Sequence, residues 1–337
     1  MGFDFGVHYS CQAPDGNTAE VYQRTVAQAE IAADLGFSSF SVAEHHFMED
    51  GWVPTPFMLL SAIAGVTDDV RVGTNVTLLP LANPIRVAER VAVLDLLSGG
   101  NARLGVSIGW RNVEFEAFGV DKRERGRRIT EGMKLVSRLL TERDVTFDGD
   151  YYAVENLTVT PRPVSDVPIW CGGQAPVAIR RAAHVADSWT ISPIESVSEL
   201  EESIGVYEDA LADAGRSIED VHVPLRREVY VAEDDETAWE EAGEAVLREY
   251  QDVYGDYDSV DADFSDDPEE AIEQIRDHAA DRFIVGGPET AIEQLERYED
   301  AVGMDELLLR THFPGLDMDL AEKSLRTISE DVMPHFE

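Results

Sequence analysis

Residues Val70–Gly109 read VRVGTNVTLLPLANPIRVAERVAVLDLLSGGNARLGVSIG, and two strands flanking one helix are recognisable in them. The first part, Val70–Leu79, is rich in apolar and β-branched residues, as buried strands are. The middle part, Pro84–Leu97, has a proline near its start and a glycine pair after its end, which is typical of a helix. The last part, Arg103–Ile108, is again strand-like. A strand, a helix and a further strand form the repeating unit of α/β proteins.

The same alternation extends toward both ends of the chain. Strands are predicted at Phe3–Tyr9, Ser38–Ala43, Val70–Leu79, Arg103–Ile108, Pro168–Cys171, Ser188–Ser192, Val221–Val231 and Glu306–Thr311. Helices are predicted at Ala19–Leu35, Pro56–Val66, Pro84–Leu97, Arg123–Leu140, Pro176–Val185, Val197–Ala214, Ala291–Val302 and Leu320–Met333. Eight strand–helix repeats without a change in composition predict one (β/α)₈ TIM barrel domain over residues 1–337.

Two insertions interrupt the repeats, at about 144–163 and 233–281. The first reads as a hairpin with Asp148-Gly149 at its turn. The second is strongly acidic, with helical patterns, an irregular stretch at 256–267 and a short extra strand at Phe283–Val285. An open doubly wound sheet is the alternative fold, but no G-x-G-x-x-G follows the first strand, where a dinucleotide-binding fold needs it.

The charge of the chain limits its partners. Acidic residues number 67 and basic residues 27, for a net charge of −40, which disfavours nucleic acid and anionic membranes. The acids are spread over most predicted helices, which favours a solvating coat for very high salt over an acidic interaction surface. We therefore expect a salt-loving host. No apolar run approaches the roughly 20 residues of a membrane span, and no signal peptide opens the chain, so a cytoplasmic location is expected.

The active site of a TIM barrel lies at the C-terminal ends of its strands. The second predicted strand ends at Glu44-His45-His46. Neighbouring strand residues point to opposite faces, so at most one of the two histidines faces the barrel mouth, where it is a candidate general acid or base. A metal site would need ligands at a spacing such as H-E-x-x-H, which is missing, so no metal is predicted.

Two further strand ends carry residues that are typical of ligand-binding sites. Cys171–Ala175 contains a glycine pair just before a helix start, an arrangement that cradles phosphate, although a simple chain turn is the alternative. In Gly109-Trp110-Arg111 a tryptophan is placed to shield an aromatic ring or merely to pack, and an arginine to hold an anion. Substrate-pocket candidates at the strand ends are His8, Arg111, Arg310 and His312.

Together these segments resemble the bacterial luciferase-like monooxygenase superfamily (LLM class flavin-dependent oxidoreductases). The resemblance spans residues 3–194, with a fainter match at 310–313 and in the last helix. It is closest in the segment quoted first, in AEHHFMEDGWVPTPFMLLSAIAG (43–65) and in FEAFGVDKRERG (115–126).

The resemblance implies a barrel that binds reduced flavin at the strand ends, with His45 as its acid–base group. It also implies a cis peptide at Asn75-Val76 beneath the isoalloxazine ring. The family holds the cofactor phosphate with an acid and a serine where this chain has Gln174 and Ala175, so backbone contacts are expected here. The predicted cofactor-binding residues are Thr74, Asn75, Val76, Gly109, Trp110, Gly172, Gly173, Gln174 and Ala175.

The resemblance leaves two cofactors open. Glu44-His45-His46 is more similar to the monooxygenases, whereas Gly109-Trp110-Arg111 and Phe115–Gly119 are also similar to a branch that uses coenzyme F-420. The first expectation is a monooxygenase that receives reduced FMN from a separate flavin reductase and acts with dioxygen on a small organic substrate. The alternatives are an F-420-dependent hydride-transfer enzyme and a non-catalytic flavin-binding barrel. In the family the helices Pro56–Val66 and Pro84–Leu97 form a dimer, so a homodimer or homo-oligomer is expected.

Overall fold

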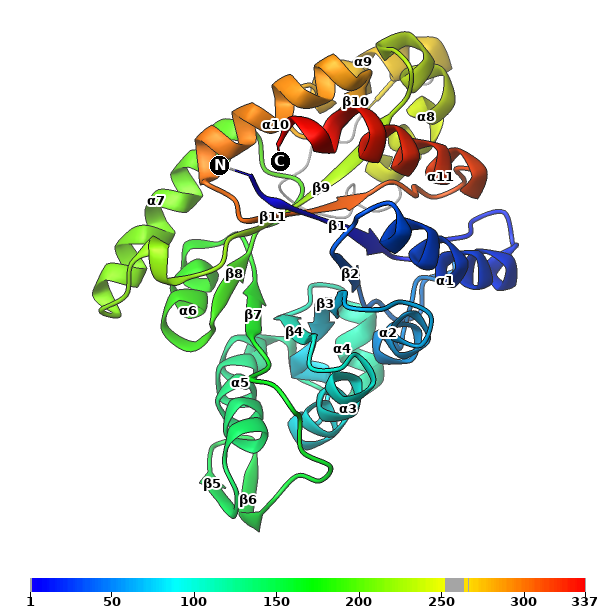
Figure 1. The fold of residues 1–337 in the computed structure, drawn as a ribbon. Coiled ribbons are helices and arrows are strands. Elements are labelled where there is room, and N and C mark those ends of the chain that lie inside the picture. Colours follow the sequence, from blue (N-terminus) through cyan, green and yellow to red (C-terminus); the bar gives the residue numbers. More distant parts are fainter. Residues whose placement is uncertain (1, 252–263, 266, 337) are drawn as a thin grey trace.

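The computed structural model describes residues 2–251, 264–265 and 267–336 (Figure 1). In these residues nine parallel strands form one sheet in the order β10-β9-β11-β1-β2-β3-β4-β7-β8. The strands are β1 (Asp4–Tyr9), β2 (Ser39–Val42), β3 (Arg71–Leu78), β4 (Ala102–Ser107), β7 (Ile169–Gly172), β8 (Ser188–Thr190), β9 (Pro224–Val231), β10 (Ile284–Gly286) and β11 (Glu306–Arg310). A parallel bridge from Ile191, just after β8, to Leu225 of β9 closes the sheet on itself. The predicted (β/α)₈ barrel is confirmed.

Helices surround the curled sheet on its outside (Figure 1). They are α1 (Thr18–Asp34), α2 (Pro56–Ala64), α3 (Pro84–Leu97), α4 (Asn112–Phe118), α5 (Arg125–Thr141), α6 (Pro176–Val185), α7 (Val197–Asp213), α8 (Asp235–Glu249), α9 (Pro268–Ala279), α10 (Pro288–Val302) and α11 (Met318–Thr327). Their starts have local causes: the Asn83 side chain accepts a hydrogen bond from the Ile85 N–H at α3, and a Ser196–Glu199 capping box begins α7. Helix α4 was not predicted, because seven residues are too few to display a helical period.

The first insertion holds a two-stranded hairpin, β5 (Val145–Asp148) and β6 (Ala153–Leu157), beside α5 (Figure 1). Its turn differs from the predicted one: Asp148 pairs with Ala153 inside the ladder, and the Gly149 N–H donates to the Tyr152 carbonyl at 3.0 Å. The cause lies in α5, where the Glu131 carboxylate accepts three successive N–H groups of the loop, those of residues 150–152.

The acidic insertion contributes α8, α9 and β10. Strand β10 pairs with β9 on the outside of the barrel, with Ile284 opposite Val229, so the extra strand expected at Phe283–Val285 is present one residue further along. Helix α8 packs against both α9 and β10. Most of the irregular stretch predicted at 256–267 lies outside the described residues.

The N-terminal end of the barrel is closed by a polar network. Buried Arg103 of β4 donates to buried Glu306 of β11 at 2.6 Å, and the Arg103 guanidinium stacks on Trp170 of β7 at 4.4 Å. Although burial opposes it, the Arg103 charge holds the pKa of Glu306 well below its usual range. With this end filled, the opposite end is where a ligand can enter.

In the part of the chain that the structure describes, no helix is both long and apolar enough to cross a bilayer.

Candidate active site

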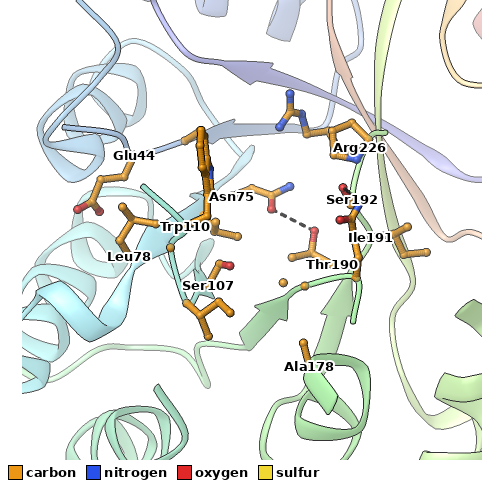
Figure 2. Close-up of a pocket in the computed structure, with 18 of the residues that line it drawn as sticks. Glu44, Asn75, Leu78, Ser107, Trp110, Ala178, Thr190, Ile191, Ser192 and Arg226 are labelled. Carbon is orange, nitrogen blue, oxygen red and sulfur yellow. Dashed lines mark hydrogen bonds between the residues drawn. The ribbon is translucent and has the colours of Figure 1, made fainter. Parts of the chain in front are cut away.

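A cavity of about 300 Å³ lies at the C-terminal ends of β2, β3, β4, β7 and β8 (Figure 2). This volume is in the range of small-molecule sites. The predicted residues that line it are His45, Asn75, Val76, Gly109, Trp110, Gly172, Gly173, Gln174 and Ala175. Lining residues that were not predicted include Ser107, Arg125, Thr190, Ser192 and Arg226. The barrel therefore brings nine of the predicted cofactor and catalytic residues to one cavity.

His45 is held by a buried carboxylate. Its Nδ1 lies 3.0 Å from Oε1 of Glu114, which is completely buried on α4. The same oxygen accepts the His46 backbone N–H at 2.9 Å. Burial alone would raise the pKa of Glu114, but these hydrogen bonds and nearby Arg111 hold it below its usual value. An ionised Glu114 only accepts, so the proton of neutral His45 resides on Nδ1 and leaves Nε2 free to exchange a proton with a ligand.

Two tryptophans frame the His45 ring. Trp52 meets it edge-on at 4.8 Å and Trp110 at 5.9 Å. His46 turns away from the cavity, with Nε2 at 2.9 Å from Glu44 and its ring 4.7 Å from Phe118. Only one of the two neighbouring histidines thus lines the cavity; because β2 already ends at Val42, the contacts of His46 with Glu44 and Phe118, and not strand alternation, turn it away.

The third strand contributes a cis peptide bond between Asn75 and Val76. Asn75 is 6% exposed, and its Oδ1 accepts from Thr190 Oγ1 at 3.0 Å across the cavity (Figure 2). Its Nδ2 makes no hydrogen bond to any described residue. Thr74, predicted to touch the cofactor, lies outside the lining because its hydroxyl bonds the backbone of Gly105 on β4, at 2.7 Å to the carbonyl and 3.1 Å to the N–H.

The turn between β7 and α6 forms another wall. Gly173 has φ +145°, and a Cβ on it would lie 2.6 Å from the Cβ of Ala178. Helix α6 begins directly afterwards at Pro176, so its N-terminal end lies beside the cavity. Gln174 Nε2 donates to Ser192 Oγ at 2.9 Å, which ties this turn to the loop after β8.

The four substrate-pocket candidates lie outside the lining of this cavity. His8 is fully buried inside the barrel, where Nδ1 is 2.9 Å from Ser41 Oγ and burial, aided by Arg226 and Arg310, holds its pKa well below the ordinary value.

The other three candidates have their own surroundings outside this cavity. Arg310 binds Glu249, which α8 of the acidic insertion places over it. His312 lines a separate polar pocket with Arg24. Arg111 donates to the His46 carbonyl at 2.7 Å.

The model of the luciferase-like monooxygenase family matches residues 4–305. Similar proteins include the oxygenase component of a flavin-dependent trigonelline monooxygenase from Acinetobacter baylyi, 24% identical over 100% of this chain and 96% of that protein. An F420-dependent glucose-6-phosphate dehydrogenase from Amycolatopsis mediterranei is 30% identical over 92% of this chain and 93% of that protein. The chain spans only 63% and 60% of the length of two uncharacterized Sinorhizobium fredii proteins.

Solved structures share the whole fold. The monooxygenase RslO1 from Streptomyces bottropensis superposes with a TM-score of 0.88 at 23% identity, covering 99% of this chain and 100% of that one. The oxygenating constituent of a Pseudomonas putida 3,6-diketocamphane monooxygenase, in complex with FMN, gives 0.79 at 19% identity over 99% of both chains. The chain belongs to the luciferase-like monooxygenase family, and the predicted family is confirmed.

Proposed function

We propose that the protein is an oxidoreductase that takes reduced FMN from a separate flavin reductase and oxygenates a small organic substrate. The observation that supports it most is the His45–Glu114 pair on the cavity wall, because a buried carboxylate that fixes one imidazole nitrogen prepares the other for proton transfer. Desolvation of this buried charge is costly, and its hydrogen bonds to His45 and to the His46 N–H offset part of that cost.

The residues of the cavity fit a flavin phosphate ester. The Gly172-Gly173 turn leaves room for close approach, the start of α6 favours an anion, and Arg125 adds a positive charge. Val76 and Trp110 offer apolar contacts to a ring, and the Asn75 Nδ2 group supplies a donor that has no hydrogen-bond partner among the described residues. Reduced FMN, when bound, supplies the two electrons that activate dioxygen.

The contribution of the protein itself is then to orient the bound groups and to shield them from water. His45 Nε2 would hold or release one proton at the cavity wall, while Trp52 and Trp110 pack against its imidazole and limit the access of water to it.

The second candidate is hydride transfer with coenzyme F-420, and the full-length similarity to the dehydrogenase from Amycolatopsis mediterranei favours it. The same His45–Glu114 pair would serve that reaction by moving the substrate proton.

A binding titration in molar salt with FMN, reduced FMN and coenzyme F-420 separates the candidates. Tight binding of reduced FMN followed by rapid reoxidation in air supports the oxygenase, and tight binding of F-420 alone replaces it with the hydride-transfer enzyme. Binding of neither cofactor would refute both. A His45→Ala variant should bind cofactor as the wild type does and lose roughly 100-fold or more in turnover; full turnover would remove His45 from the mechanism.

A further inference from the structure

A second cavity adjoins the candidate active site. Its volume is about 340 Å³, and it lies between α6, α7 and the ends of α8 and α9. Gln174 and Ile194 line both cavities, and the hydrogen bond from Gln174 to Ser192 stands in the wall between them. Nothing in the proposed flavin chemistry uses this space.

The wall of the second cavity is acidic, with Glu195, Glu199 and Glu202. Glu199 is already engaged, because it caps the start of α7 and lies 3.6 Å from Arg282. Glu202 is exposed at the rim.

Glu195 is different, because it is only 7% exposed. Its Oε1 accepts from Ser203 Oγ at 2.7 Å, whereas its Oε2 makes no hydrogen bond within the described residues. Arg227 is the nearest buried cation, but its NH2 donates to the backbone carbonyl of Glu195 at 3.1 Å, and its guanidinium lies 4.7 Å over the Tyr298 ring. A buried carboxylate oxygen without a partner is costly unless a ligand brings a hydrogen-bond donor or a positive charge to it.

Aromatic rings complete the cavity. Tyr250 at the end of α8 and His278 of α9 both line it, with ring centres 4.8 Å apart and planes nearly perpendicular. A carboxylate beside aromatic rings is the combination that recognises ammonium groups. An anionic ligand would meet Glu195 and Glu202, because Arg282 of the wall lies beside Glu199. A metal ion is less suited, because no three His, Cys, Asp or Glu side chains of the described residues are placed so that they could hold one.

We infer that this second cavity binds a small organic cation, a protonated or quaternary amine, with Glu195 as its counter-ion. The binding itself does not depend on the reaction.

The test is a calorimetric titration of the full chain with choline and with its neutral isostere 3,3-dimethylbutan-1-ol. Choline should bind, and the neutral isostere should bind at least about tenfold more weakly. Glu195→Gln should weaken choline binding by at least about tenfold, whereas Glu208→Gln, at an exposed site on α7 and removing the same charge, should leave it unchanged.

The pH dependence gives a second readout. Burial raises the pKa of Glu195 to about 7, with Arg227 opposing and Glu199 reinforcing the shift. Choline is permanently charged, so its affinity should rise between about pH 6 and pH 8 as Glu195 ionises. His278 and Arg282 face the cavity in every variant, so Glu195→Gln should remove the part of the pH dependence that belongs to Glu195.

Equal affinity for choline and its isostere, or no change in Glu195→Gln, would overturn the inference, as would absence of choline binding. Glu202→Gln is a milder variant at the exposed rim, where a substitution leaves the fold intact. It should weaken choline binding by about threefold. These titrations need no flavin, so their failure is distinct from a failure of flavin binding.

Discussion

At the scale of single residues, the orientation of His45 depends on Glu114, which lies 69 positions further along the chain. Glu114 also accepts the His46 N–H, so one carboxylate positions both the imidazole and the backbone that carries it. A buried charge with two defined hydrogen-bond partners acts through geometry, and a neutral isostere should disturb it while leaving the fold intact.

Glu114→Gln should lower kcat by roughly 10- to 100-fold, because an amide no longer stabilises a positively charged His45. Cofactor affinity should stay near that of the wild type. The measurement is steady-state turnover across pH with the same flavin reductase as for the wild type, where the pH profile of the variant should differ from that of the wild type. Glu116→Gln, exposed on the same helix, is the matched control; an equal loss there, or an unmoved pH profile, contradicts a positioning role.

The surroundings of His312 lead to a prediction about the pH dependence of stability. Burial, together with Arg310, lowers its pKa from 6.5 to about 4. The unfolded chain therefore takes up this proton at a higher pH than the folded chain, so the free energy of unfolding falls as pH drops from about 6.5 to 4, by up to about 3 kcal/mol. Urea unfolding of His312→Gln should show a flatter decline than the wild type. The exposed His335→Gln control should keep the wild-type slope, and parallel curves for wild type and His312→Gln would exclude this contribution.

At the scale of elements, the connection from β7 to α6 is both a turn and a wall of the cavity. Its backbone must approach a ligand closely, and Gly173 adopts a positive φ that side chains rarely accept. The helix start behind it has no side-chain cap, which leaves that end of α6 available to an anion.

Gly173→Ala should destabilise the protein by roughly 1–3 kcal/mol, because both φ and the contact with Ala178 oppose a Cβ. Binding of reduced FMN should weaken by at least about tenfold. Thermal unfolding and flavin titration are the measurements. Gly205→Ala, inside α7 with open space around it, should instead be neutral or stabilising; similar behaviour of the two variants would disprove the special role of the turn.

At the scale of the whole molecule, α2 and α3 expose a group of apolar side chains. Met58 is 73% exposed, and Val93, Leu96 and Leu97 on α3 are 42–53% exposed. Exposed apolar side chains gathered on neighbouring helices commonly mark a protein interface. We propose that this patch joins two copies of the chain.

Leu97→Glu should therefore shift the particle mass in solution from dimer toward monomer, as measured by light scattering after gel filtration, because a charge would be buried in the contact. Val177→Glu, on the exposed start of α6, should keep the mass of the wild type. A monomeric wild type would refute the proposal.

The net charge of −40 gives a second prediction at this scale. Repulsion among the surplus carboxylates destabilises the folded state in dilute buffer, and salt screens it. The unfolding temperature should rise as NaCl increases from about 0.1 M to about 2 M. Full stability in dilute buffer would argue against a salt-loving host.

The sequence alone determined the repeat of strands and helices, because apolar periodicity, prolines at helix starts and glycines at helix ends are local signals. It also placed His45, Trp110 and the Gly172-Gly173 turn at strand ends, and the barrel rule puts all such ends on one side. These residues were therefore predictable without coordinates.

The tertiary structure alone decided which distant side chains meet. Glu114 came to His45 on a helix too short to predict, Thr190 reached Asn75 only through closure of the barrel, and Glu249 covered Arg310 from an insertion. A strand end specifies a side of the barrel, but packing of elements far apart in the chain decides whether a side chain there faces the cavity or a partner.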